Sequence, residues 1–359
     1  MGLPGLAECS PRPERPSLII AGGSIRATPG AALGLLLMLL VGCAGLAPAT
    51  PGQAGPSQAS PADSKRPCMT GVFLGDKDLA AGYEAYVQLT GTRPQLLLTF
   101  VPWVREGGLP FPANFCGFAR DRGAIPIITW EPWDPQTDWH PLLEDIAAGR
   151  HDAHLREWAD AGRQWRLPVL LRFAHEMNGS WYPWCERKNP LQTASSYVAA
   201  WRRIREVFRQ AGAENIQFVW APNFEPAEHL EKYWPGSGDV DWVGMDLYSR
   251  PAWARNPAEM LRPILQFAKQ RGKSVILTEV GCAETPPASR PVQGSREWAA
   301  KPHWIEQLFA SVAQEPCIRG LVWFEVEKEA DWRIASSSAS VVAFRRGLLR
   351  LDSKELTNR

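Results

Sequence analysis

Short apolar runs alternate with amphipathic segments from residue 68 almost to the end of the chain. Eight of these runs have the length of a strand and are rich in Val, Ile and Leu, which is typical of parallel strands that are buried on both faces. They lie at 69–75, 95–101, 124–131, 168–176, 216–223, 240–248, 274–281 and 318–326. The pattern therefore predicts eight parallel strands.

Apolar positions at helical spacing fill the intervals between the runs. The expected helices cover 79–90, 154–165, 195–210, 258–270 and 297–313. Eight strands that alternate with helices predict an α/β fold of the (β/α)₈ TIM barrel type, in a single domain. An open doubly wound sheet would alternate in the same way, but no glycine-rich phosphate loop follows the first strand.

The N-terminal segment has a different pattern. Residues 31–41 form an apolar run about as long as the core of a signal peptide and too short to span a bilayer, and Gly42-Cys43 follows it. This predicts a lipoprotein signal peptide over 1–42, with Cys43 as the lipidated first residue of an exported protein that faces the periplasm or the cell exterior. A plain secretory signal cut near Ala47 or Ala49 is the alternative.

The segment 43–67 is rich in Pro, Gly, Ala and Ser and contains no aromatic residue. Such a segment cannot bury enough apolar surface to offset its ordering entropy, so we expect a flexible tether. The barrel is then expected over 68–350, followed by a C-terminal tail over 351–359.

The amino-acid composition excludes one class of partner for this barrel. The 359 residues include 39 Lys and Arg against 38 Asp and Glu, so no basic excess is available to neutralise the phosphates of a nucleic acid. We expect a monomer without a nucleic-acid partner. The 17 Trp residues have two explanations. They can fill a large core, or they can line a cleft in which the apolar face of a sugar packs on their rings.

Two carboxylates lie at strand ends, where barrels of this type carry their function. Glu176 and Glu279 each close an apolar run, and a buried carboxylate is costly without a partner or a chemical role. Arg172 lies four residues before Glu176 on the same strand face, where a guanidinium would keep a neighbouring carboxylate ionised. One protonated and one ionised carboxyl group are what glycoside hydrolysis requires. A purely structural ion network is the alternative, and the pattern allows Asp246 and Glu325 to point outward into loops.

Several segments carry a family resemblance when taken together. LLRFAHEMNGSWYPW at 170–184, WAPN at 220–223, the block 233–248 and ILTEVG at 276–281 resemble glycoside hydrolase family 26, the β-mannanase family. The resemblance extends over about 70–347. It implies a retaining mechanism with Glu176 as acid/base and Glu279 as nucleophile, and it implies no metal and no organic cofactor.

The resemblance also implies which residues surround the substrate. The side chains expected to contact the sugar are His175, Trp181, Tyr248, Trp323, Trp130, Trp133 and Asn223. Arg172 and Asn178 are expected to support them.

The substrate itself stays open at this point. A histidine that mannanases of the family carry before the fourth strand has no counterpart here, so β-1,3-xylan, mixed-linkage β-glucan and exopolysaccharides remain alternatives to β-1,4-mannan. A carbohydrate-binding lipoprotein without catalytic activity is the alternative of another class.

The cysteines give one further expectation, because thiols of exported proteins tend to be paired. Cys68 and Cys317 each lie three residues before a glycine, in the first and eighth strands respectively. These strands become neighbours when a barrel closes. Matched offsets therefore predict a disulfide between Cys68 and Cys317, with the shear of barrel strands as the main argument against it.

Overall fold

The computed structural model describes residues 68–75, 78–104, 108–227, 229–284 and 300–357. The chain divides into two units, 1–58 and 59–359, and the described residues all belong to the second. The predicted signal peptide, Cys43 and the tether over 43–67 lie outside the described residues.

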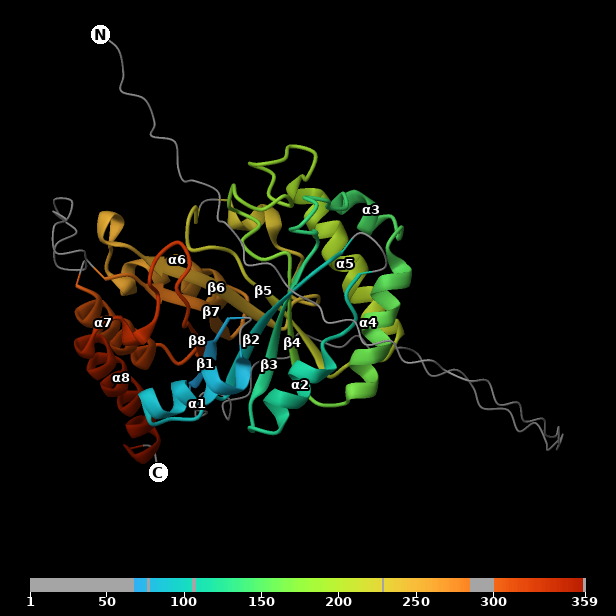
Figure 1. Cartoon of the computed structure of the whole chain (residues 1–359). Helices are drawn as coiled ribbons and strands as arrows, with labels where there is room; N and C mark the ends of the chain where they lie inside the picture. Colours follow the sequence, from blue (N-terminus) through green and yellow to red (C-terminus); the bar gives the residue numbers. More distant parts are fainter. Residues whose placement is uncertain (1–67, 76–77, 105–107, 228, 285–299, 358–359) are drawn as a thin grey trace, which may run out of the picture. The chain divides into compact units, whose positions relative to one another are not determined.

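Eight parallel strands close into a barrel in which each strand pairs with the next and the last pairs with the first. This confirms the predicted (β/α)₈ fold, and every expected strand is present (Figure 1). The strands are β1 (Met69–Phe73), β2 (Leu96–Pro102), β3 (Ile125–Glu131), β4 (Val169–Phe173), β5 (Ile216–Trp220), β6 (Trp242–Ser249), β7 (Val275–Cys282) and β8 (Ile318–Phe324).

Helices surround the barrel, and Figure 1 shows α8 beside α1 where the barrel closes. The α-helices are α1 (Leu79–Thr90), α2 (Ala113–Arg120), α3 (Leu143–Ala147), α4 (Asp152–Trp165), α5 (Ala194–Gln210), α6 (Pro257–Gln270), α7 (Lys301–Gln314) and α8 (Ser338–Thr357). Short 3₁₀ turns are η2 (Leu230–Tyr233), η3 (Pro251–Trp253) and η4 (Ile334–Ser336). Among the described residues, no helix is both long and apolar enough to cross a bilayer.

The helix boundaries follow local chemistry. The Asp78 carboxylate caps α1 by accepting a hydrogen bond from the Ala81 amide, and Gly91 ends this helix in the left-handed conformation that glycine adopts without strain. The sequence pattern did not predict α2, α3 or α8. Because α8 continues to Thr357, the expected tail over 351–359 is helical as far as that residue.

The alternation of side chains along each strand divides the core into two layers. Inward-facing residues such as Leu98, Ile127 and Val322 fill the barrel. Outward-facing residues pack against the helices and include most of the buried tryptophans. Among the described residues, nine tryptophans are almost fully buried: Trp103, Trp130, Trp158, Trp184, Trp201, Trp220, Trp304, Trp323 and Trp332. Core packing therefore accounts for much of the tryptophan excess.

The expected disulfide between Cys68 and Cys317 is wrong. Met69 pairs with Gly320 in the β1–β8 ladder, so Cys68 lies level with Arg319, and Cys317 is two residues further toward the amino end. The shear of the barrel thus separates two cysteines whose offsets in the sequence are equal. All five described cysteines are free thiols.

Candidate active site

A buried ion network lies at the centre of the barrel. Arg172 on β4 is level with Thr129 on β3, and both face the interior. One amino group of the guanidinium donates to both carboxylate oxygens of Asp246, at 2.7 and 2.6 Å. The other donates to Thr129 Oγ1 at 2.7 Å and also to Glu279 Oε1. Arg172 therefore joins two carboxylates from different strands.

The charges in this network stabilise one another. Burial opposes the charge on Arg172, but Asp246 and Glu279 outweigh this effect and raise the pKa of Arg172, so the guanidinium stays cationic. The Tyr248 hydroxyl donates to Glu279 Oε2 at 2.5 Å. Burial, followed by the charge of Glu279, raises the pKa of Tyr248 and keeps this donor protonated. Both oxygens of Glu279 thus accept hydrogen bonds suited to an ionised carboxylate.

A β-bulge in β7 brings Glu279 to the inner face. Met245 pairs with Leu277 but the next residue, Asp246, pairs with Glu279, so β7 holds one extra residue at Thr278. Leu277 and Val280 both face the helices, and the two residues between them both face the interior. Thr278 Oγ1 uses this position to donate to Asp246 Oδ1 at 2.7 Å. The bulge therefore supplies both the nucleophile candidate and a partner for Asp246.

Glu176 lies in a turn of unusual backbone conformation directly after β4. Ala174 and Glu176 have φ angles of 43° and 52°, in the left-handed region that side chains other than glycine rarely adopt. Such conformations persist when the surroundings hold them, and they cluster at functional sites. Here the Glu176 amide donates to Ala221 O at 2.8 Å, and the Trp184 indole donates to His175 O at 2.8 Å. The turn fixes where the Glu176 side chain points.

The surroundings of Glu176 favour a carboxyl group that both donates and accepts protons. Burial, followed by the negative charge of the neighbouring Glu279, raises the pKa of Glu176 to about 7. The indole N–H of Trp181 donates to Glu176 Oε2 at 2.6 Å and the Asn223 amide donates to Oε1, and both bonds oppose this rise. Trp181 is 44% exposed, so one face of its ring is open to a ligand.

Asn178 fixes the position of Asn223 through hydrogen bonds. Its side-chain amide donates to Asn223 O at 2.9 Å and to Pro226 O at 2.8 Å. The Asn223 backbone amide donates in return to Asn178 Oδ1 at 2.9 Å. Asn178 therefore supports the site through another residue, as the resemblance implies.

An aromatic cluster borders His175. His175 Nε2 lies 3.8 Å from Glu279 Oε1 and 3.1 Å from the Tyr182 hydroxyl. Tyr182 stacks on Trp184 with ring centroids 4.3 Å apart, and Trp133 meets both rings edge-on. Trp133 is 9% exposed. The structure thus brings His175 and Trp133 to the edge of the site, with Tyr182 between them.

Two of the tryptophans expected to contact the sugar lie elsewhere. Trp130 is fully buried on the helix side of β3, where it stacks on Trp158 of α4 with ring centroids 4.3 Å apart. Trp323 is fully buried on the helix side of β8, donates to Trp332 O at 2.9 Å and packs against Phe344 of α8. Assigning both to the sugar site is wrong, because strand neighbours alternate between the two faces.

The sequence pattern left Asp246 open, and the structure places it inside the network. A period of two counted back from Tyr248 puts Asp246 on the same inner face, which is the signal that could have identified it. Glu325 is half-buried, with a pKa raised by burial to about 7, and its Oε2 accepts from the Ile334 amide at 2.8 Å. Glu325 therefore anchors η4.

In the part of the chain that the structure describes, His175, Glu176 and Asp246 each offer a possible metal ligand, within 4.8 Å of one another. Both carboxylate oxygens of Asp246 already accept hydrogen bonds from Arg172, so this carboxylate is part of an ion pair.

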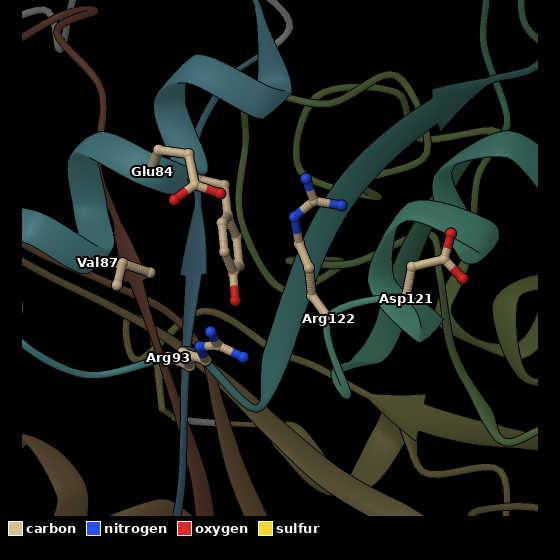
Figure 2. Close-up of a pocket in the computed structure, with 6 residues that line it drawn as sticks. Glu84, Val87, Arg93, Asp121 and Arg122 are labelled. Atoms are coloured by element: carbon tan, nitrogen blue, oxygen red, sulfur yellow. The ribbon is translucent and has the colours of Figure 1, made fainter.

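A pocket of about 300 Å³ lies at the other end of the barrel (Figure 2). It is lined by Glu84 and Val87 of α1 and by Arg93, Asp121 and Arg122, which lie in or next to the segments that lead into β2 and β3. These segments enter the amino ends of the strands, whereas Glu176 and Glu279 lie at carboxyl ends. The pocket is therefore no part of the site.

The comparison with family models agrees with this geometry. Residues 147–285 match the model of glycosyl hydrolase family 26, and this stretch contains both Glu176 and Glu279. This part of the chain is similar to glycosyl hydrolase family 26. The resemblance carried by 170–184 and 276–281 is thereby confirmed.

Two similar proteins are named for different activities. Endoglucanase H of Acetivibrio thermocellus is 27% identical over 289 residues, which are 77% of this chain and 30% of the endoglucanase. The β-1,3-xylanase TXYA of a Vibrio species is 24% identical over 270 residues, which are 70% of this chain and 56% of the xylanase. The chain therefore spans less than two thirds of either relative.

A solved structure shares the fold of the barrel. The β-mannanase BoMan26A of Bacteroides ovatus superimposes with a TM-score of 0.56 at 18% identity, over 80% of this chain and 89% of that one. At this identity the likeness supports the barrel alone.

Proposed function

We propose that the protein is a retaining glycoside hydrolase that cuts a β-linked polysaccharide by double displacement. The observation that carries this proposal is the contrast between two neighbouring carboxyl groups. Glu279 accepts hydrogen bonds from the Arg172 guanidinium and the Tyr248 hydroxyl, whereas burial raises the pKa of Glu176 to about 7. Such a contrast assigns the roles of nucleophile and acid/base.

The reaction then has two steps. Glu279 attacks the anomeric carbon while Glu176 gives its proton to the departing glycosidic oxygen, so the glycosidic bond breaks and a glycosyl-enzyme ester forms. Glu176, now ionised, takes a proton from water, and the water oxygen displaces Glu279 from the anomeric carbon. Both carboxyl groups return to their starting states, and the sugar keeps its anomeric configuration.

The first candidate substrate is β-1,4-mannan, supported by the similarity to glycosyl hydrolase family 26. The endoglucanase and xylanase relatives favour mixed-linkage β-glucan and β-1,3-xylan as alternatives, with exopolysaccharides as a further one. Release of reducing sugar should be measured across these four substrate classes, with Glu279→Gln as the blank. Release from none of them, together with binding to one, would favour a non-catalytic carbohydrate-binding protein.

The proposal predicts a pH dependence. Because Glu176 must hold a proton to assist the leaving group, kcat/KM on a polysaccharide is expected to fall as the pH rises through about 7. An aryl glycoside with an activated leaving group needs no such proton. Glu176→Ala should therefore still form the glycosyl-enzyme from that substrate, and the rate of this step should show no decline near pH 7. Pre-steady-state release of the aryl group across pH 5–9 measures it.

The same measurement can contradict the assignment of Glu176 as the group that titrates near pH 7. A decline near pH 7 that persists in Glu176→Ala would place the titrating group elsewhere, and Glu325 is then the next carboxyl group to test, since its pKa is also raised to about 7.

We further propose that the protein is exported as a monomeric lipoprotein anchored to a membrane through Cys43. The support is the apolar run 31–41 followed by Gly42-Cys43. The mature chain is expected to begin at a lipidated Cys43 and to sediment with membranes, and Cys43→Ser should block processing or release the protein. Mass spectrometry that finds an unmodified N-terminus near Ala47 or Thr50 would contradict the anchor.

A further inference from the structure

Arg250 is an arginine without a counter-ion at the carboxyl end of the barrel. It follows β6 with φ −127° and ψ 151°, so the extended backbone continues through it and the alternation of side chains still applies. Arg250 therefore lies on the same face as Asp246 and Tyr248. It is two residues beyond Tyr248, or about 6–7 Å further along the strand. Arg250 therefore lies beyond Tyr248, further toward the carboxyl end of the barrel.

The guanidinium is held over an aromatic ring that belongs to the site. The Arg250 Cζ lies 5.1 Å from the centroid of Trp332. Trp332 in turn lies 5.0 Å from Tyr248, whose hydroxyl binds Glu279. The stack of Arg250, Trp332 and Tyr248 thus connects a cation to the nucleophile candidate.

Two donors in this stack have no acceptor among the described residues. They are Arg250 Nε and the indole Nε1 of Trp332, and both atoms are buried. Trp332 is 2% exposed as a whole residue. A buried donor without an acceptor is costly, and a ligand that supplied an acceptor would remove this cost.

Other arginines near the carboxyl ends of the strands have carboxylate partners. Arg255 lies 2.5 Å from Glu225, and Arg333 lies 2.7 Å from Asp331. Arg250 has no ion pair in the described part of the chain, and its guanidinium contacts the ring of Trp332. Its positive charge therefore stays available in a site that already contains Glu176, Glu279 and Asp246. Arg172 already pairs with Asp246 and Glu279, and a second cation would lower further the repulsion that an anionic substrate meets from these acids.

We propose that Arg250 determines specificity by binding a carboxylate on the sugar unit next to the scissile bond, so that the preferred substrate is an acidic β-linked polysaccharide. A planar guanidinium matches the two oxygens of a carboxylate, and partial burial strengthens the pair. This inference rests on the proposed hydrolase function and specifies its substrate class.

A matched pair of polymers tests the inference. One is the neutral polysaccharide that the protein cleaves best, and the other is the same polymer with part of its C6 hydroxymethyl groups oxidised to carboxylates. The ratio of kcat/KM on the oxidised polymer to kcat/KM on the neutral one is expected to be about tenfold lower in Arg250→Gln than in the unmutated protein. Arg250→Lys keeps the positive charge but lacks the planar guanidinium. Its ratio should fall between those of Arg250→Gln and the unmutated protein.

Arg255→Gln is the matched control, because it removes the same charge from an exposed arginine of the same loop. It should leave the ratio unchanged, and 0.5 M salt should lower the ratio of the unmutated protein. An equal ratio in Arg250→Gln and the unmutated protein would overturn the inference and leave Arg250 as packing for Trp332.

Failure of the hydrolase proposal looks different, since then neither polymer is cut. Calorimetric binding of a uronic-acid oligosaccharide and its neutral counterpart decides the role of Arg250 in that case. Tighter binding of the acidic ligand that Arg250→Gln abolishes supports the inference, and equal binding of the two ligands overturns it.

Discussion

Glu279→Gln is expected to lower kcat on polysaccharide by about 10⁴-fold or more, on the scale of losses seen when a hydrolase loses its nucleophile. The amide has nearly the shape of the carboxylate but cannot form the glycosyl-enzyme ester. It also places an NH₂ group where either Arg172 or Tyr248 now donates. Steady-state hydrolysis measures the loss, and thermal melting checks that the variant is folded.

Chemical rescue makes the assignment specific to Glu279. In Glu279→Ala, azide can enter the space left by the side chain and attack the anomeric carbon of an activated aryl glycoside. The expected product is a glycosyl azide of inverted configuration, because one displacement replaces two. A retained configuration, or near-normal turnover of polysaccharide by Glu279→Ala, would show that another residue is the nucleophile.

Arg172→Met is expected to destabilise the fold by about 3–5 kcal/mol, because it leaves Asp246 and Glu279 uncompensated in the barrel interior. The free energy of unfolding from urea titration measures this change. Lys269→Met is the matched control, since it breaks an exposed ion pair with Glu315 and should cost less than about 1 kcal/mol.

A second substitution tests the reason for this loss. Asp246→Leu in the Arg172→Met background removes one of the two stranded carboxylates and should restore part of the stability. If Arg172→Met is as stable as the unmutated protein, or if the double variant is less stable than the single one, uncompensated charge is not what destabilises the barrel.

The sequence is sufficient for the barrel because its strands are uniformly apolar. A parallel strand buried on both faces reads as one continuous run, and β4 and β7 are evident for this reason. Glu176 and Glu279 stand out for the same reason, as charges that interrupt or end such runs. Continuous runs carry no sign of which face each residue takes. Trp130 and Trp323 were assigned to the cleft for this reason. In each case it is the adjacent strand residues that face the interior, whereas the tryptophan faces the helices.

Other features depend on relations between strands that no single strand contains. The bulge at Thr278 becomes visible only in the pairing of β7 with β6, and the separation of Cys68 from Cys317 only in the register of β1 with β8. Neither is encoded as a local motif. The position of Asp246 can be predicted only in part from the sequence. Its inward orientation follows from the period of β6 once Tyr248 is known to face the site.

The distribution of the tryptophans also decides which spectroscopic signal can follow sugar binding. Most of the intrinsic fluorescence of the barrel comes from rings enclosed between strands and helices, and these report unfolding. Trp181 differs, because it is 44% exposed and bonded to Glu176. Trp181 is therefore expected to contribute to an emission change on adding oligosaccharide, together with Trp133 and Trp332 at the edge of the site. The difference spectrum between the unmutated protein and Trp181→Phe isolates the contribution of Trp181, and acrylamide quenching with and without sugar measures how far the bound ligand covers it.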